Sequence, residues 1–166
     1  MSSIIKVDQI QLADGSTPTA GDLGLNVTGG VLQVVSGSYS TSTTNNTTTY
    51  TDTNITATIT PSSTSSKVLV LVTVASVWKD SSNNSVFIRL VRDSTVINKL
   101  GEGYIAYTSD TSTNGIGSVN TAELDSPNTT SAVTYKVQFR AEAATNQVGF
   151  SGSSTKSTIT LLEIAG

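Results

Sequence analysis

The sequence predicts an all-β protein: an antiparallel β-sandwich of jelly-roll type that follows an extended N-terminal arm. Three observations predict this fold. Short apolar or alternating runs recur after Gly30 with turn residues between them, at the spacing of ~8–12 residues that sandwiches and barrels show. No window of helical length has an apolar period of 3.6 residues. Ser and Thr supply about a third of the chain and charged residues only 13%, which suits exposed strands covered with hydroxyl groups.

The first strands follow from the apolar pattern between residues 31 and 77. Residues 31–35 (VLQVV) form a short apolar run, and the polar segment 39–52 after it is either an exposed edge strand or a long loop. Residues 54–60 (NITATIT) alternate between apolar side chains and polar ones, which predicts a strand buried on one face. Residues 67–77 (KVLVLVTVASV) are apolar at nearly every position and predict a central strand covered on both faces.

The second half of the chain continues the series. Asn-Gly is a strong turn signal, so the pair Asn114-Gly115 predicts a turn within a loop at residues 110–117. Residues 134–141 alternate cleanly and predict another half-buried strand. In all, further strands are expected at residues 86–92, 96–100, 104–108, 119–124, 134–141, 147–150 and 158–164.

Residues 1–30 differ from the sandwich predicted at 31–166. They contain a few dispersed apolar side chains, a proline and several glycines, and isolated two-stranded pieces are marginally stable in water. The arm therefore needs a partner surface, which is its own sandwich, a symmetry mate or another protein. The residues predicted to contact that partner are Ile5, Val7, Ile10, Leu12, Pro18, Leu23, Leu25 and Val27.

The composition argues against several classes of function. A net charge of −3 leaves no basic surplus for nucleic acid. The chain has no Cys and no His, so it lacks thiolate metal ligands, disulfides and the commonest general base. No run approaches the ~18 apolar residues of a membrane helix, and the first residues do not have the pattern of a signal peptide. We expect no cofactor, no bound metal and synthesis in the cytoplasm.

Carboxylates offer the only enzymatic hypothesis. Glu123 and Asp125 alternate on one predicted strand, and Glu102 and Asp110 flank a tyrosine segment, as the two carboxyls of a glycosidase could. We expect instead that these are solvated acids and that the chain is not an enzyme. The polar loops 80–84 and 110–114 carry Asp and Asn oxygens of the kind that bind calcium, but they lack EF-hand spacing, so hydrogen-bonded turns are expected there.

Aromatic side chains give the candidates for glycan binding. Trp78 is the only tryptophan, and it follows the most apolar run and precedes an Asn-rich loop. Tyr104 and Tyr107 are the other candidates. For Trp78 the favoured interpretation is packing in the core or between subunits, and stacking on a sugar is the alternative.

Four stretches of the chain resemble a known protein family. These are Lys6–Gln11 (KVDQIQ) with Gly15–Leu25 (GSTPTAGDLGL), Gly30–Val35 (GVLQVV), and Ile55–Val74 (ITATITPSSTSSKVLVLVTV). The order of these stretches resembles virion structural proteins of tailed phages, especially the tail-fibre and capsid-associated proteins of marine and freshwater phages. The ending at residues 160–164 (TLLEI) matches the way such chains end. The resemblance covers the N-terminal half well and the C-terminal half loosely.

The resemblance implies an N-terminal anchoring arm, a β-sandwich head and assembly as a homotrimer. Because the chain lacks a long shaft, it implies a capsid decoration (cement) protein on the outer surface of the virion, with itself and the capsid or another virion protein as partners. The alternative is a short tail or head fibre that binds a host-surface glycan. Neither function involves nucleic acid or a membrane.

Overall fold

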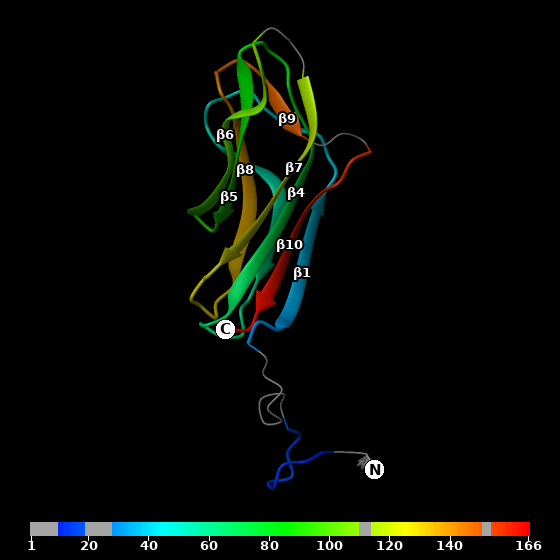
Figure 1. Cartoon of the computed structure of the whole chain (residues 1–166), viewed down its shortest axis with the longest axis vertical. Helices are drawn as coiled ribbons and strands as arrows, with labels where there is room; N and C mark the ends of the chain where they lie inside the picture. The colour runs from blue at the N-terminus through cyan, green and yellow to red at the C-terminus, as the bar shows by residue number, and fades with distance from the viewer. Residues whose placement is uncertain (1–9, 19–27, 110–113, 151–153) are drawn as a thin grey trace, which may run out of the picture.

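The computed structural model describes residues 10–18, 28–109, 114–150 and 154–166, and strands in these ranges form two antiparallel sheets (Figure 1). No helix occurs in the described ranges, so the predicted all-β class and antiparallel sandwich are confirmed. The first sheet consists of β1 (Val31–Tyr39), β2 (Thr43–Asn45), β4 (Lys67–Lys79), β7 (Asn114–Asp125), β9 (Val148–Phe150) and β10 (Ser157–Ile164). The second consists of β3 (Thr51–Ile59), β5 (Asn84–Arg92), β6 (Thr95–Thr108) and β8 (Val133–Ala141).

The connections cross repeatedly between the two sheets. The first sheet has the order β1-β10-β4-β9-β2, with β7 on β4 as well, and the second has the order β3-β8-β5-β6. If the three-residue strands β2 and β9 are left aside, each strand is followed by a strand of the other sheet, except at the β5–β6 hairpin. The jelly-roll type stays a prediction, and this alternation is the feature of the connectivity that supports it.

The core lies between the sheets and is built from alternate residues of each strand. Every second residue of β3 and of β8 is buried, as the alternation in both segments predicted. Phe139 of β8 and Phe150 of β9 meet edge to face with ring centroids 5.1 Å apart, which joins the two sheets. The largest fully buried side chains are Tyr135, Lys79, Phe139, Phe150, Ile55, Ile59, Ile88, Leu90, Ile159, Leu161, Glu163 and Val68.

The prediction that residues 67–77 are covered on both faces is wrong for the single chain. The strand, β4, is central, and its inward residues such as Val70 and Val74 are buried. Leu71 points to the other face and is 39% exposed, and Leu69 is only partly buried. The reason is that the described part of the chain places its second sheet on one face of β4 alone.

Two further boundaries differ from prediction. The prediction of a turn at Asn114-Gly115 is wrong, because these two residues begin β7 and lie opposite Lys79 and Trp78 of β4. The two runs 96–100 and 104–108 join into the single strand β6, whose register with β5 shifts near Gly101. Long-range pairing outweighs a local turn signal in the first case, and a bulge accommodates the glycines in the second.

Candidate binding surfaces

The described part of the arm is exposed. Residues 10–17 are all solvent-exposed, with Ile10 at 49% and Leu12 at 36%. A turn orders the segment locally, because the Gly15 amide donates to the Leu12 carbonyl over 2.9 Å. Asp14 accepts hydrogen bonds from the side chain and amide of Ser16, which lower its pKa. Pro18 is half-buried, and the predicted contact residues Ile5, Val7, Leu23, Leu25 and Val27 lie outside the described residues.

The base of the arm pairs with the end of the chain. The Gly29 amide donates to the Ala165 carbonyl and the Ala165 amide donates to the Gly30 carbonyl, both over 2.8 Å. These bonds extend the β1–β10 pairing by one step. Thr28 and Leu32 line a hollow of about 380 Å³ beside this junction. Residue 28 and the C-terminus therefore lie at the same end of the sandwich (Figure 1).

Four aliphatic side chains form a continuous row across the outer face of the first sheet. The strand registers place Val34 opposite Leu162 and Leu162 opposite Leu69. Leu69 in turn lies opposite Leu124 of β7. Val34 is 58% exposed and Leu124 is 51% exposed. We call Val34, Leu162, Leu69 and Leu124 the aliphatic row, and it is an apolar band that water covers in the single chain.

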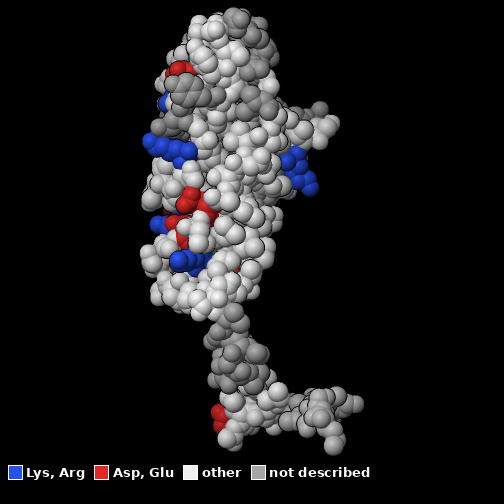
Figure 2. Space-filling view, in the orientation of Figure 1, with Lys and Arg blue, Asp and Glu red and all other residues white. Residues whose placement is uncertain are grey.

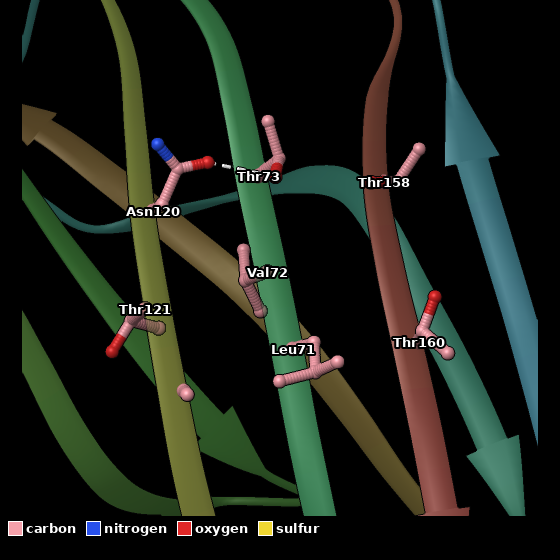
Figure 3. Close-up of a pocket in the computed structure, with 8 residues that line it drawn as sticks. Leu71, Val72, Thr73, Asn120, Thr121, Thr158 and Thr160 are labelled. Carbon is pink, nitrogen blue, oxygen red and sulfur yellow. Dashed lines mark hydrogen bonds between the residues drawn. The ribbon is translucent and has the colours of Figure 1, made fainter.

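Farther from the arm, the same face becomes rich in hydroxyl groups. A hollow of about 580 Å³ lies there, and Thr73 donates to the Asn120 Oδ1 atom over 2.8 Å at its margin (Figure 3). The hollow is lined by Leu71, Val72, Thr73, Asn120, Thr121, Ala122, Thr158 and Thr160, none of which carries a charge. Figure 2 shows a white surface over β4, β10 and β1, with charged atoms at its margins. The region of the hollow therefore offers apolar and hydroxyl contacts without charge, whereas the exposed Lys67 of β4 lies on the same face beyond Leu69.

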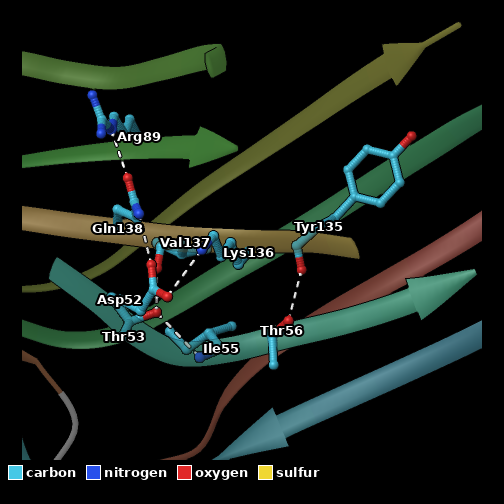
Figure 4. Close-up of polar contacts among 9 residues, drawn as sticks. All are labelled: Asp52, Thr53, Ile55, Thr56, Arg89, Tyr135, Lys136, Val137 and Gln138. Atoms are coloured by element: carbon cyan, nitrogen blue, oxygen red, sulfur yellow. Dashed lines mark hydrogen bonds and ion pairs between the residues drawn. The ribbon is translucent and has the colours of Figure 1, made fainter. Parts of the chain in front are cut away.

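The outer face of the second sheet carries a network of polar side chains that contains one ion pair, Lys136 with Asp52. Asp52 accepts hydrogen bonds from Lys136 over 3.0 Å and from Gln138 over 2.6 Å, and Arg89 donates to Gln138 over 2.9 Å (Figure 4). Burial favours the neutral form of Asp52, but the hydrogen bonds and the charges of Lys136 and Arg89 outweigh it and lower the pKa. The network fixes these side chains across β3, β8 and β5.

Trp78 lies on the outer side of the first sheet and is half-buried. A bulge at Ser76, where φ is 53°, moves the inward positions of β4 from Val74 to Val77 and turns Trp78 outward. The indole covers Gly149, because a Cβ atom at that glycine would stand 2.6 Å from the ring. Its opposite neighbour on β7 is Gly115. Trp78 thus packs on the backbone of one glycine and has another glycine at its side.

The other aromatic candidates belong to β6. Tyr107 is exposed, and its hydroxyl donates to Asn83 over 3.2 Å. Lys79 donates to the Thr108 carbonyl over 3.4 Å, so the strand ends that carry Trp78 and Tyr107 are adjacent. Tyr104 is in β6, but its side chain lies outside the described residues. The structure therefore brings two of the three predicted glycan-binding residues to one end of the molecule.

The two carboxylates proposed as a catalytic pair are engaged in structural contacts. Asp125 forms an ion pair with Arg92 and accepts a hydrogen bond from the Tyr135 hydroxyl over 2.7 Å. Glu123 accepts one from Asn98 over 2.6 Å. Burial and the hydrogen bond to Asp125 raise the pKa of Tyr135. The expectation that these acids are freely solvated is therefore wrong, because they connect β7 to the second sheet.

The loop predicted as a possible calcium site is a hydrogen-bonded turn at residues 80–84. Asp80 Oδ1 accepts from the Gln147 amide over 2.7 Å and from the Ser81 hydroxyl over 2.8 Å. Asn84 is buried and accepts from the Glu142 amide over 3.3 Å. The second loop, including Asp110, lies outside the described residues, as does the Glu102 side chain. Within the described ranges no group of three or more metal-ligating side chains occurs.

A buried carboxylate near the arm was not recognised in the sequence. Glu163 of β10 is fully buried and accepts hydrogen bonds from Gln33 over 2.6 Å and from the amide and hydroxyl of Ser62, each over 2.7 Å. Burial favours its neutral form, but these donors outweigh burial and lower its pKa to about 2. Glu163 therefore ties β10 to β1 and to the turn before β4.

Comparison with protein-family models finds no match, and comparison with curated proteins finds no significant relative in sequence. In the described ranges there is no helix of the length and hydropathy needed to span a membrane.

Proposed function

We propose that this chain is a structural protein of a tailed-phage virion: a homotrimeric capsid decoration protein attached to the outer surface of the particle through residues 1–30. The proposal assigns no catalytic step to the chain. The number of copies and the particle follow from the resemblance in sequence. The surfaces supply the physical means of association.

The observation that carries the proposal is the aliphatic row on the outer face of the first sheet. The two end residues of the row are more than half exposed and the two between them are half-buried. Their apolar surface costs free energy in water, and burying it against a second copy recovers it. None of the described residues that line the hollow beside the row carries a charge, so identical surfaces can approach there without repulsion. Packing between copies would also supply the second cover that the sequence of β4 predicts.

The exposed arm supports the attachment. Ile10 and Leu12 present apolar surface on a segment with no core of its own. An arm without a core of its own can pair its backbone with a strand edge on another protein and place its apolar side chains in grooves there. Three arms on a trimer would bind with avidity, which raises retention far above that of one arm.

The attachment is tested by removing the arm. We expect a chain that starts at residue 28 to stay folded and trimeric, because the described contacts of the sandwich lie within residues 28–166, but to lose co-sedimentation with phage particles. Full-length protein carrying Ile10→Asp and Leu12→Asp should be retained less well, whereas Asp14→Asn should be retained as the wild type. Retention of the truncated chain at the wild-type level would contradict the role of the arm.

The second candidate is a short fibre that binds a host-surface glycan through Trp78. The half-buried indole beside Gly115, with Tyr107 at the adjacent strand end, favours it, because flat aromatic faces next to small residues can accept a sugar ring. Trp78→Ala should then abolish adsorption to host cells, while Tyr39→Phe, an aromatic change elsewhere, should not. A decoration protein without this activity should show no adsorption in either form.

A further inference from the structure

Two arginines on the outer face of the second sheet are held by aromatic rings. The Arg89 Cζ atom lies 3.8 Å from the centroid of the Tyr50 ring. The Arg140 Cζ atom lies 3.6 Å from the Phe87 centroid and 5.3 Å from that of Tyr50. Phe87 is directly opposite Arg140 in the β5–β8 register, and Tyr50 immediately precedes β3. We call Tyr50, Phe87, Arg89 and Arg140 the arginine–aromatic stack.

Neither guanidinium group forms an ion pair with a carboxylate among the described residues. Arg92 is paired with Asp125, and Lys136 with Asp52. Among the described residues, Arg89 donates to an amide oxygen, that of Gln138, through Nε, and Arg140 to its neighbouring carbonyl, that of Ala141, through Nη1. The other N–H groups of both guanidiniums make no hydrogen bond within the described ranges. They are positioned to donate to a ligand.

The stack prepares both groups for binding an anion. A guanidinium presents its N–H donors as a planar fork that matches a carboxylate or sulfate, and two parallel hydrogen bonds result. Stacking on Tyr50 and Phe87 fixes the plane of each fork before a ligand arrives, which reduces the entropy lost on binding. All four side chains are half-buried, so the stack is packed on the sheet and is still in contact with solvent.

We propose that the arginine–aromatic stack binds carboxylate groups of an acidic polysaccharide. The neighbouring Asp52 and Glu142 carboxylates disfavour the closely spaced phosphates of nucleic acid more than they disfavour widely spaced single charges. A uronate polymer spaces its carboxylates with neutral hydroxyl-bearing carbons. Those hydroxyls can donate to Asp52, which lies opposite Gln138, the side chain that Arg89 contacts. This inference concerns a different face from the aliphatic row and does not depend on the proposed function.

The test compares one polymer in two charge states. Oligogalacturonate and its methyl ester have the same backbone, and only the first carries carboxylates. We expect the full-length chain to bind the acid form at least ten times more tightly in titration calorimetry. Arg89→Gln and Arg140→Gln should each weaken binding about tenfold, because each removes a charge-assisted pair of hydrogen bonds. Lys156→Gln removes an equal charge from an exposed site on the loop before β10 and should change affinity less than twofold.

Arg→Lys substitutions distinguish the contribution of the paired guanidinium hydrogen bonds from that of the positive charge. Arg89→Lys and Arg140→Lys keep the charge and should still lose most of the binding, since a lysine cannot make the paired contact. Thermal unfolding of each variant verifies that the sandwich is intact. Equal binding of the methyl ester, wild-type binding by the double Gln variant, or binding of poly-glutamate or oligo-thymidylate as tight as that of oligogalacturonate would overturn the proposal.

Discussion

The outer faces of the two sheets satisfy their side chains in different ways. On the second sheet, Asp52, Lys136 and Gln138 bond to one another across strands, and the arginines lie on aromatic rings. On the first sheet, Val34 and Leu124 are more than half exposed, and the hollow beside them is lined by aliphatic, hydroxyl and amide side chains. A hydrated polar network is stable facing water, whereas an exposed aliphatic row is not. The difference is that apolar surface is left exposed on the first face, whereas the polar side chains of the second face are hydrogen-bonded to one another.

The largest expected effect is the loss of association between copies when a charge is placed in the aliphatic row. Leu124→Asp places a charge in the aliphatic row at a position that is half exposed in the single chain, so the fold should tolerate it. In an assembled trimer the charge would be buried without a partner, at a cost of about 3–5 kcal/mol, and association should weaken more than ~100-fold. Size-exclusion chromatography with light scattering measures the change.

A matched substitution tests which part of that face matters. Ser38→Asp adds the same charge on the same face, in the hydroxyl-rich region of β1. It should reduce trimer stability by less than ~1 kcal/mol, because a rim charge stays hydrated. If both variants dissociate the trimer equally, the aliphatic row is not the centre of the interface.

The next effect concerns Glu163, which holds the arm-proximal end of the first sheet. Its pKa is lowered from 4.5 to about 2 in the folded chain. The stability that it contributes is therefore complete above about pH 4.5 and is lost as the pH falls toward 2. The contribution is ~3 kcal/mol. Denaturant unfolding at a series of pH values should show this loss in the wild type and not in Glu163→Gln. The same dependence of the free energy of unfolding on pH in both proteins would contradict the role of Glu163.

A smaller effect on stability is expected where the Trp78 indole packs on Gly149. Gly149→Ala would bring a Cβ atom within 2.6 Å of the indole, so the ring must move, at a cost of ~1–3 kcal/mol. Gly115→Ala meets only a carbonyl oxygen, that of Val77, at 3.9 Å, and should leave the ring in place. Tryptophan fluorescence and thermal unfolding report both changes. An unchanged emission spectrum in Gly149→Ala would show that Trp78 does not depend on this glycine.

The smallest expected effect lies on the second face. Asp52→Asn removes the partner of Lys136, and both side chains are partly exposed. Surface pairs of this kind contribute ~0.2–1 kcal/mol, and salt screens them. Chemical denaturation at low and high salt should show a difference that shrinks as salt increases. A loss that salt does not change would mean that Asp52 acts through its hydrogen bond to Gln138 alone.

Local pattern predicted the strands well and the surfaces poorly. The alternation around Ile55 and Phe139 reports burial directly, because each side chain points to the opposite face from its neighbour. The apolar outer positions of β4 also gave a signal, since Leu69 and Leu71 predicted a second cover. Nothing in one chain's sequence states which molecule supplies it.

Contacts between distant residues could not be predicted in this way. Tyr50 meets Arg140 only because β3 pairs with β8, and the four residues of the aliphatic row come together through three strand registers. The bulge at Ser76 changed the direction of Trp78, although the apolar run gave no sign of it. Register and bulges depend on long-range pairing, which local composition does not encode.

The most direct test of the central claim, that the aliphatic row is buried between copies, is the mass of the full-length chain in solution. Sedimentation equilibrium at micromolar concentration should give three times the chain mass of 17.2 kDa. A single species of 17.2 kDa across the whole concentration range would contradict the account, because the row would then face water in the functional protein.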